Sequence, residues 1–141
     1  MISHHKVRLI ATVMLVAVLG AGCSGGTSTL PEAFSGVAPT QAAEIIDTYE
    51  GDGFTLIDVR TPGEYAAGFI EGAINIDFYE PSFASEIGAL DRDERYFVYC
   101  RSGNRSASTM DLMEQLGFTD VHHLDGGIND WIAAGNTVVV P

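Results

Sequence analysis

The chain has 141 residues, which is enough for one domain and short for two. It contains 19 acidic residues against seven lysines and arginines, so its formal net charge is −12. A surface of this charge repels nucleic acid and anionic lipid headgroups, and we therefore expect no DNA- or RNA-binding role.

The N-terminal segment has the layout of a secretory signal. Lys6 and Arg8 precede an apolar run from Leu9 to Leu19, and small residues then lead to Cys23. The run is too short to span a bilayer comfortably. We predict that residues 1–22 are removed, which would leave five arginines, no lysine and all 19 acidic residues, a net charge of −14.

Residues 19–23, LGAGC, resemble a bacterial lipobox, in which the cysteine is lipid-modified. Gly20 stands where that pattern has a larger aliphatic residue. The resemblance implies acyl chains such as palmitate on Cys23, which would anchor the protein to the cell membrane on its extracytoplasmic side. The alternative is a secreted or periplasmic soluble protein. Residues 23–36 are rich in Gly, Ser and Thr, and we expect a flexible tether there.

From residue 37 to residue 141, short apolar runs alternate with helical segments, which predicts an α/β domain. In chain order we expect a helix over 39–50, a strand over 54–59, a helix from 61 to 68, a strand over 72–76, a helix over 81–90, a strand over 95–100, a helix over 105–117, a strand over 120–124 and a helix over 126–135.

Local signals support two of these helices. Thr61, Pro62 and Glu64 have the spacing of an N-cap, a first-turn proline and a capping-box partner. The segment 105–117 is amphipathic, and Gly117 provides a C-terminal stop.

Strands separated by helices imply parallel pairing with right-handed crossovers. In such sheets the ligand site lies outside the carboxyl ends of the strands. Three polar clusters leave expected strands at that edge: DVR (58–60), CRSGNR (100–105) and DGG (125–127). We therefore expect the chemistry of the protein at this edge.

Cys100 could be a buried filler residue, half of a disulfide, a metal ligand or a nucleophile. If Cys23 carries lipid, Cys100 has no partner within the chain, because these are the two cysteines present. His122 and His123 are adjacent on a strand and so point to opposite faces, and no third ligand stands at metal-site spacing. We therefore expect no metal.

The residues after Cys100 favour an anion-binding loop. The chain passes from a buried strand into a helix, so its backbone N–H groups can form a nest beside the helix N-terminus. Gly103 permits an unusual backbone conformation, and Ser102, Asn104 and Ser106 supply side-chain hydrogen bonds. Arg101 and Arg105 invert the local charge, which favours a small anionic substrate. Such a loop lowers the pKa of the thiol.

Three segments together resemble a single-domain rhodanese, a sulfurtransferase family: LIDVRTPGEYAAGFIEGAINID (56–77), VYCRSGNRSA (98–107) and GFTDVHHLDGGINDW (117–131). The resemblance implies a three-layer fold, with a parallel sheet of about five strands flanked by helices. It also implies a catalytic cysteine at the first position of a six-residue loop, here Cys100 to Arg105.

The resemblance further implies the reaction. Cys100 would take the outer sulfur of thiosulfate or a similar anionic donor as a persulfide and pass it to cyanide or a thiol, with no cofactor. A protein thiol is an alternative acceptor. Asp58 and Arg60 match the family's DVR motif, and we expect them to brace the loop.

Two other function classes remain to be compared. Related phosphatases and arsenate reductases need five residues between cysteine and arginine, whereas four separate Cys100 from Arg105. A membrane-tethered persulfide carrier or binding module with little turnover would accept sulfur but release it poorly to cyanide.

Overall fold

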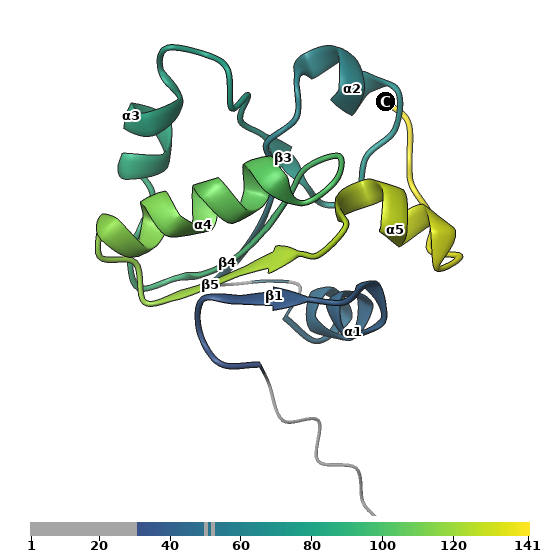
Figure 1. Cartoon of the computed structure of the whole chain (residues 1–141), viewed down its shortest axis with the longest axis horizontal. Coiled ribbons are helices and arrows are strands. Elements are labelled where there is room, and N and C mark those ends of the chain that lie inside the picture. Colours follow the sequence, from purple (N-terminus) through teal and green to yellow (C-terminus); the bar gives the residue numbers. More distant parts are fainter. Residues whose placement is uncertain (1–30, 50, 52) are drawn as a thin grey trace, which may run out of the picture.

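Five parallel strands form the centre of the structure, and helices cover both faces (Figure 1). The computed structural model describes residues 31–49, 51 and 53–141, so the predicted signal, Cys23 and most of the predicted tether lie outside the described residues. In chain order the elements are β1 (Ser35–Val37), α1 (Pro39–Tyr49), β2 (Phe54–Asp58), α2 (Pro62–Ala66), β3 (Ile74–Asn75), α3 (Phe83–Gly88), β4 (Arg95–Tyr99), α4 (Asn104–Gln115), β5 (Asp120–Leu124) and α5 (Gly127–Ala133).

The strands lie in the order β1-β5-β4-β2-β3, and every neighbouring pair is parallel. The strand β4, which leads to Cys100, therefore lies at the centre between β5 and β2. This arrangement confirms the predicted α/β fold with a five-stranded parallel sheet. Within the described residues, no helix is long and apolar enough to cross a membrane.

The edge strand β1 was not predicted from the sequence. Its residues Ser35 and Gly36 fall in the segment expected to be a tether, but they pair in register with His122 and His123 of β5. The Ser35 hydroxyl also contacts His122 Nδ1 at 3.1 Å. The folded part therefore begins at least two residues before the expected boundary at Val37, because pairing with β5 orders a stretch that has little apolar patterning of its own.

Alternation along β4 divides the interior into two layers. Tyr96, Val98 and Cys100 face one side of the sheet, where they pack with apolar residues of α3 and α4. Phe97 and Tyr99 face the other side, where α1 and α5 cover them. The sulfur of Cys100 thus belongs to the α3–α4 side, since successive side chains of a strand point to opposite faces.

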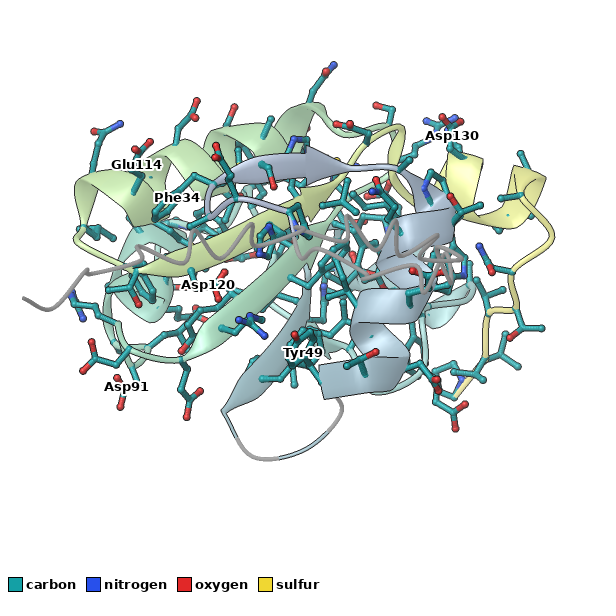
Figure 2. The ribbon with its side chains drawn as sticks, turned by 90° about the horizontal axis from the view of Figure 1, so that it is seen from below. Phe34, Tyr49, Asp91, Glu114, Asp120 and Asp130 are labelled. Atoms are coloured by element: carbon teal, nitrogen blue, oxygen red, sulfur yellow. The ribbon has the colours of Figure 1, made fainter. Side chains whose placement is uncertain are left out.

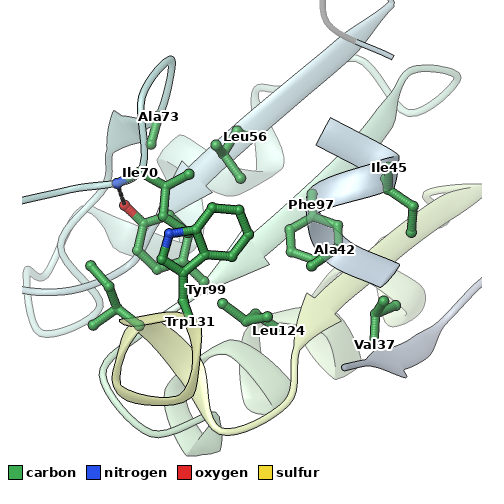
Figure 3. Packing of buried hydrophobic residues seen from close by; sticks show 11 residues of the cluster. Val37, Ala42, Ile45, Leu56, Ile70, Ala73, Phe97, Tyr99, Leu124 and Trp131 are labelled. Carbon is green, nitrogen blue, oxygen red and sulfur yellow. Dashed lines mark hydrogen bonds between the residues drawn. The ribbon is translucent and has the colours of Figure 1, made fainter. Parts of the chain in front are cut away.

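The layer opposite Cys100 contains Trp131, the largest aromatic side chain of the interior. Trp131 of α5 packs with Tyr99 and Ile70 in one cluster (Figure 3). The Ile70 amide donates to the Tyr99 hydroxyl at 3.0 Å, and the Trp131 indole donates to the carbonyl of Thr137 at 2.8 Å. These bonds satisfy the polar ends of two buried rings, so the layer beneath the loop is packed without orphaned polar groups.

The predicted start of α2 is confirmed in detail. The Thr61 hydroxyl accepts from the Glu64 amide, and the Glu64 carboxylate accepts from the Thr61 amide, which completes a capping box. The helix α4 begins one residue earlier than expected, at Asn104, and Gly117 follows its end with a φ of 85°.

The acidic residues that dominate the composition lie mainly on the periphery. Asp91, Glu114 and Asp130 are exposed, and Figure 2 shows their side chains at the rim of the molecule. Asp58, by contrast, is fully buried. The negative charge therefore surrounds the domain, and the carboxyl edge of the sheet must supply its own positive groups to attract an anion.

Candidate active site

The three polar clusters predicted at the carboxyl edge include two that meet directly. The first turn of α5 donates to the Cys100 loop: the Ile128 amide bonds to the carbonyl of Cys100 at 2.9 Å, and the Asn129 amide bonds to that of Arg101 at 3.2 Å. The carbonyl groups of Cys100 and Arg101 are thus bonded to the amides of α5, while the N–H groups of the loop remain available to the sulfur. The loop therefore offers hydrogen-bond donors to the sulfur, and these two carbonyl acceptors are already occupied.

Cys100 is a free thiol with 1% of its surface exposed. Its Sγ accepts the backbone N–H of Gly103 at 3.1 Å, and the Ser106 hydroxyl lies 3.6 Å from it. Burial by itself raises the pKa of the thiol, but hydrogen bonds from Ser106, Ser102 and Gly103 outweigh that effect. The pKa of Cys100 therefore lies below its ordinary value, as the sequence predicted for a nucleophile in a nest of amides.

Two glycines make this loop geometry attainable. Gly103 has a φ of 98° and lies so close to Gly126 that an added Cβ would stand 3.2 Å from that residue's nitrogen. Gly127 has a φ of 62°, and a Cβ there would lie 2.5 Å from both the carbonyl oxygen of Cys100 and the carbonyl carbon of Arg101. The absence of side chains lets α5 approach the loop closely enough to bond with it.

Arg101 is the free cation of the site. Its side chain is exposed, and its guanidinium makes no hydrogen bond or ion pair with the described part of the chain. Together with Asn129 and Ile132 it lines a cavity of about 250 Å³ between the loop, α2 and α5. A positive group without an internal partner, one residue from the thiol, can bind an incoming anion.

Arg105, which was also predicted to bind substrate, has a different partner. Its Nη1 and Nη2 bond to the two oxygens of Glu64, each at 3.0 Å. Its guanidinium also lies over the ring of Tyr79, 5.4 Å from the centroid. The role expected for Arg105 stays a prediction, but in this structure both terminal nitrogens are occupied by α2, so Arg105 joins the start of α4 to that helix.

Asp58, the last residue of β2, and Arg60 form a buried ion pair, and their expected role as a brace of the loop stays a prediction. The Arg60 Nη2 lies 2.6 Å from the Asp58 carboxylate and 2.7 Å from the carbonyl of Gly68, and both residues are at least 94% buried. The guanidinium also lies over the ring of Tyr99, the residue before Cys100, at 5.7 Å. Burial tends to lower the pKa of Arg60, but its bond and charge interaction with Asp58 raise that pKa overall. The pair is therefore positioned to support the loop through Tyr99.

The remaining predicted residues line the loop itself. Ser102 and Asn104 are exposed, and Asn104 is the first residue of α4. Ser102 contributes its backbone amide to the sulfur. Within the described residues neither side chain forms a hydrogen bond, so both remain open to a substrate.

Ser106 was expected to supply a side-chain hydrogen bond, but its contact with His123 was not predicted from the sequence. Ser106 is fully buried, and its hydroxyl touches both Cys100 and His123. His123 was considered in the sequence only as a metal ligand. Its spacing from Cys100 carries no signal, because the contact depends on how β5 pairs with β4. Within the described residues, no group of three or more His, Cys, Asp or Glu side chains could hold a metal ion.

A free thiol of lowered pKa, in an amide-rich loop at the carboxyl edge of a parallel sheet, makes Cys100 the candidate nucleophile of an α/β protein. Comparison with known proteins specifies the family further. The rhodanese-like domain family matches residues 38–134. The thiosulfate sulfurtransferase GlpE of Pseudomonas aeruginosa (strain LESB58) is 36% identical over 102 residues, which cover 72% of this chain and 87% of that protein.

Two further relatives agree. GlpE of Pseudomonas putida (strain KT2440) is 36% identical over 100 residues, covering 71% of this chain and 86% of that protein. The crystal structure of a rhodanese-related protein from Thermoplasma volcanium has a TM-score of 0.64 and 34% identity, and the match covers 76% of this chain and 99% of that one. The chain belongs to the rhodanese-like domain family, which confirms the resemblance found in its sequence.

Proposed function

We propose that this protein is a sulfurtransferase that moves a sulfane sulfur from thiosulfate, or a similar small anionic donor, to a thiophilic acceptor through a persulfide on Cys100. The observation that carries the proposal is the buried Cys100 sulfur, bonded by the amide of Gly103 and held at a lowered pKa by its loop. Its relatives from Pseudomonas are named thiosulfate sulfurtransferases, which supports the same reaction class.

In the first half-reaction, the Cys100 thiolate attacks the outer sulfur of the donor. A sulfur–sulfur bond forms to Cys100, the sulfur–sulfur bond of thiosulfate breaks, and sulfite leaves with the electron pair. The exposed guanidinium of Arg101 holds the anionic end of the donor, and the amides that bind the thiolate bind the persulfide anion in its turn.

The depth of Cys100 suits this exchange. A disulfide bond is about 2 Å long, so the added sulfur stands about 2 Å nearer to the mouth of the loop than Sγ itself. The thiol, 1% exposed at the residue level, is shielded, while the sulfur to be transferred is presented to the acceptor.

In the second half-reaction, a nucleophile attacks that outer sulfur and the Cys100 thiolate leaves. Cyanide would give thiocyanate, and a thiol would give a new persulfide. No metal or organic cofactor is required, because the sulfur itself changes partners without net transfer of electrons to the protein.

The test is the intact mass of the protein after incubation with thiosulfate, for the wild type and for Cys100→Ser. We expect one added sulfur atom on the wild type, removed by dithiothreitol and absent from the variant. Subsequent addition of cyanide should release thiocyanate. A wild type that takes up no sulfur and yields no thiocyanate would refute the proposal, whereas sulfur uptake with poor release to cyanide would indicate a carrier that serves a protein acceptor.

We also propose that Cys23 carries a lipid anchor on the extracytoplasmic side of the membrane. The proposal rests on the sequence alone, through the short apolar run before the LGAGC segment. Cys23→Ala should move the protein from the membrane fraction to the soluble fraction, and unchanged membrane association would refute the anchor.

A further inference from the structure

A chain of three polar side chains, Ser106, His123 and Asp125, leads away from the sulfur of Cys100 to the surface of the protein. The Ser106 hydroxyl lies 3.6 Å from Cys100 Sγ and 3.3 Å from His123 Nδ1. On the far side of the ring, His123 Nε2 lies 3.5 Å from the carboxylate of Asp125. Ser106 and His123 are both buried, so water competes little for the contact between them, whereas the Asp125 carboxylate is exposed.

The Ser106 hydroxyl has one hydrogen and three neighbours that can accept it. Besides the sulfur and the ring, the carbonyl of Gly103 lies 3.0 Å away, and it already accepts the Ala107 amide at 2.9 Å. A carbonyl can only accept, and a thiolate can only accept, but an imidazole nitrogen accepts or donates according to its protonation. The state of the ring therefore decides where this hydrogen goes.

Asp125 influences which nitrogen is bare in the neutral ring. Its carboxylate only accepts, so it favours the hydrogen on Nε2 and leaves Nδ1 as a competitor for the Ser106 hydroxyl. When the ring is doubly protonated, Nδ1 donates to Ser106 Oγ instead. The Ser106 hydroxyl can then donate its hydrogen bond to Cys100 Sγ, because a thiolate is a stronger acceptor than the neutral carbonyl of Gly103.

We propose that His123 is a positioning residue of the active site, which directs the Ser106 hydroxyl either toward its own ring or toward the sulfur of Cys100, according to whether Nδ1 carries a proton. The proposal rests on the proposed function only in that Cys100 is the nucleophile. Protonation of His123 and ionisation of Cys100 then favour each other, since linkage between two sites is reciprocal.

The surroundings of the His123 ring determine its pKa, and thus the pH range in which it gains a proton. Burial lowers the pKa of His123, while the carboxylates of Asp125 and of Asp111 on α4 act in the opposite direction. Its partners in the sheet are Gly36 of β1 and Val98 of β4, neither of which carries a charge, and the charged residue of β4, Arg95, forms an ion pair with Asp120. Burial outweighs the two carboxylates, so the ring is neutral near pH 7 and gains a proton as the pH falls.

The test is the rate of alkylation of Cys100 by iodoacetamide as a function of pH, measured on the peptide that contains Cys100. Alkylation reads the thiol alone, so it remains decisive even if no sulfur transfer is found. A single ionisation reduces the rate roughly tenfold per pH unit below the thiol pKa. We expect the wild type to fall less steeply over the range in which His123 gains its proton, and His123→Leu to follow the single-ionisation profile.

The matched control is His122→Leu, which removes the neighbouring buried ring on the opposite face of β5, bonded to Ser35 and Asp120 instead of Ser106. This variant should keep the wild-type profile. In a Ser106→Ala background, His123→Leu should cause no further change. A profile that His123→Leu leaves unaltered, or alters equally without Ser106, overturns the proposal.

A second measurement covers the case in which His123→Leu does not fold. The pKa of the His123 ring, measured by NMR in the wild type and in Cys100→Ser, should be lower in the variant, because the thiolate that favours the protonated ring is gone. Equal values in the two proteins would also overturn the proposal.

Discussion

The guanidinium of Arg105 and the carboxylate of Glu64 face each other with two N–O distances of 3.0 Å. This pair joins the first turn of α4 to α2, two elements that lie 41 positions apart in sequence at these residues. Glu64 also completes the capping box with Thr61. One carboxylate therefore caps the N-terminus of α2 and binds α4, the helix that begins beside the Cys100 loop. The two arginines of the loop therefore differ in role: Arg105 forms a structural ion pair, whereas the Arg101 side chain has no partner in the described part of the chain.

Arg101→Gln should weaken the use of thiosulfate without affecting the fold. The side chain is exposed and has no internal partner in the described part of the chain, so its loss removes only a contact with the donor. A hydrogen bond to a charged group contributes about 1.5–3 kcal/mol, which corresponds to a rise of roughly tenfold or more in KM. Steady-state kinetics with thiosulfate measure this, and the unfolding midpoint should stay unchanged.

Arg92→Gln is the comparison for that variant. Arg92 is also exposed, but it bonds to the carbonyls of Gly88, Leu90 and Leu116, away from the loop. We expect it to lose some stability and to keep the KM of the wild type. If the two variants raised KM equally, overall charge and not a contact at the loop would be the cause.

Glu64→Gln should make stability less sensitive to acid. The bond to Arg105 is the main cause that holds the pKa of Glu64 at about 2, against an ordinary value of 4.5, and the Thr61 amide contributes. A lowered pKa in the folded state gives stability that is fully present above about pH 4.5 and is lost as the pH falls toward 2. Glutamine can still serve the capping box, so the variant isolates the ion pair.

Urea unfolding at several pH values checks this prediction. At pH 7 we expect Glu64→Gln to cost about 1 kcal/mol, since the pair is only partly buried. The difference from the wild type should shrink as the pH approaches 2. Glu114→Gln, on the exposed face of α4, is the control and should follow the wild type at every pH. A constant difference across the range would argue against the ion pair as the cause.

Gly127→Ala should displace the Cys100 loop. The new Cβ would stand 2.5 Å from the carbonyl oxygen of Cys100 and would also occupy a left-handed conformation, at a φ of 62°. Gly135→Ala is matched, because Gly135 has a φ of 88° but open space around it. Backbone strain alone costs about 1–3 kcal/mol, so both variants lose that stability.

The difference between these two alanine variants reports the contact with the loop. Gly127→Ala should lose additional stability and should load sulfur on Cys100 more slowly, whereas Gly135→Ala should load it at the wild-type rate. Equal loading rates in the two proteins would mean that the approach of α5 does not shape the loop.

Asp58→Asn should be the most destabilising of these substitutions. It leaves the buried guanidinium of Arg60 without its counter-charge, and breaking a buried pair costs about 3–5 kcal/mol. Asp120→Asn breaks the pair with Arg95, in which each side chain is 25% exposed, and should cost about 1 kcal/mol or less. Equal losses in urea unfolding would contradict the view that Asp58 and Arg60 form the brace of the site.

Local sequence was sufficient for nine of the ten elements and for the choice of Cys100 as the candidate nucleophile. The helix α2 was predictable because its capping box lies within four residues, and the strand β4 because its apolar run ends at a polar loop. Cys100 and its loop were recognisable because Gly103, the serines and the helix start all lie within seven positions. Each of these signals depends on neighbours in the chain, whose spacing the backbone dictates.

The edge strand β1 could not be predicted from local sequence patterns. Its three residues, Ser35–Val37, have no alternation long enough to indicate a strand, and Gly and Ser are as common in a tether. The partner that orders them, β5, lies 87 positions away at Ser35 and His122. No local pattern could report that pairing.

Contacts between segments far apart in sequence also decide which side chains surround the sulfur of Cys100, and for this reason they could not be predicted. Whether Arg105 points to a substrate or to Glu64 depends on where α2 packs, and whether His123 meets Ser106 depends on the register of β5 beside β4. The amino-acid order was enough to identify Cys100 as the candidate nucleophile and to define the loop that holds it. Packing between distant elements decided which cation remains free and which side chains lie behind the thiol, because those contacts exist only once the layers have closed.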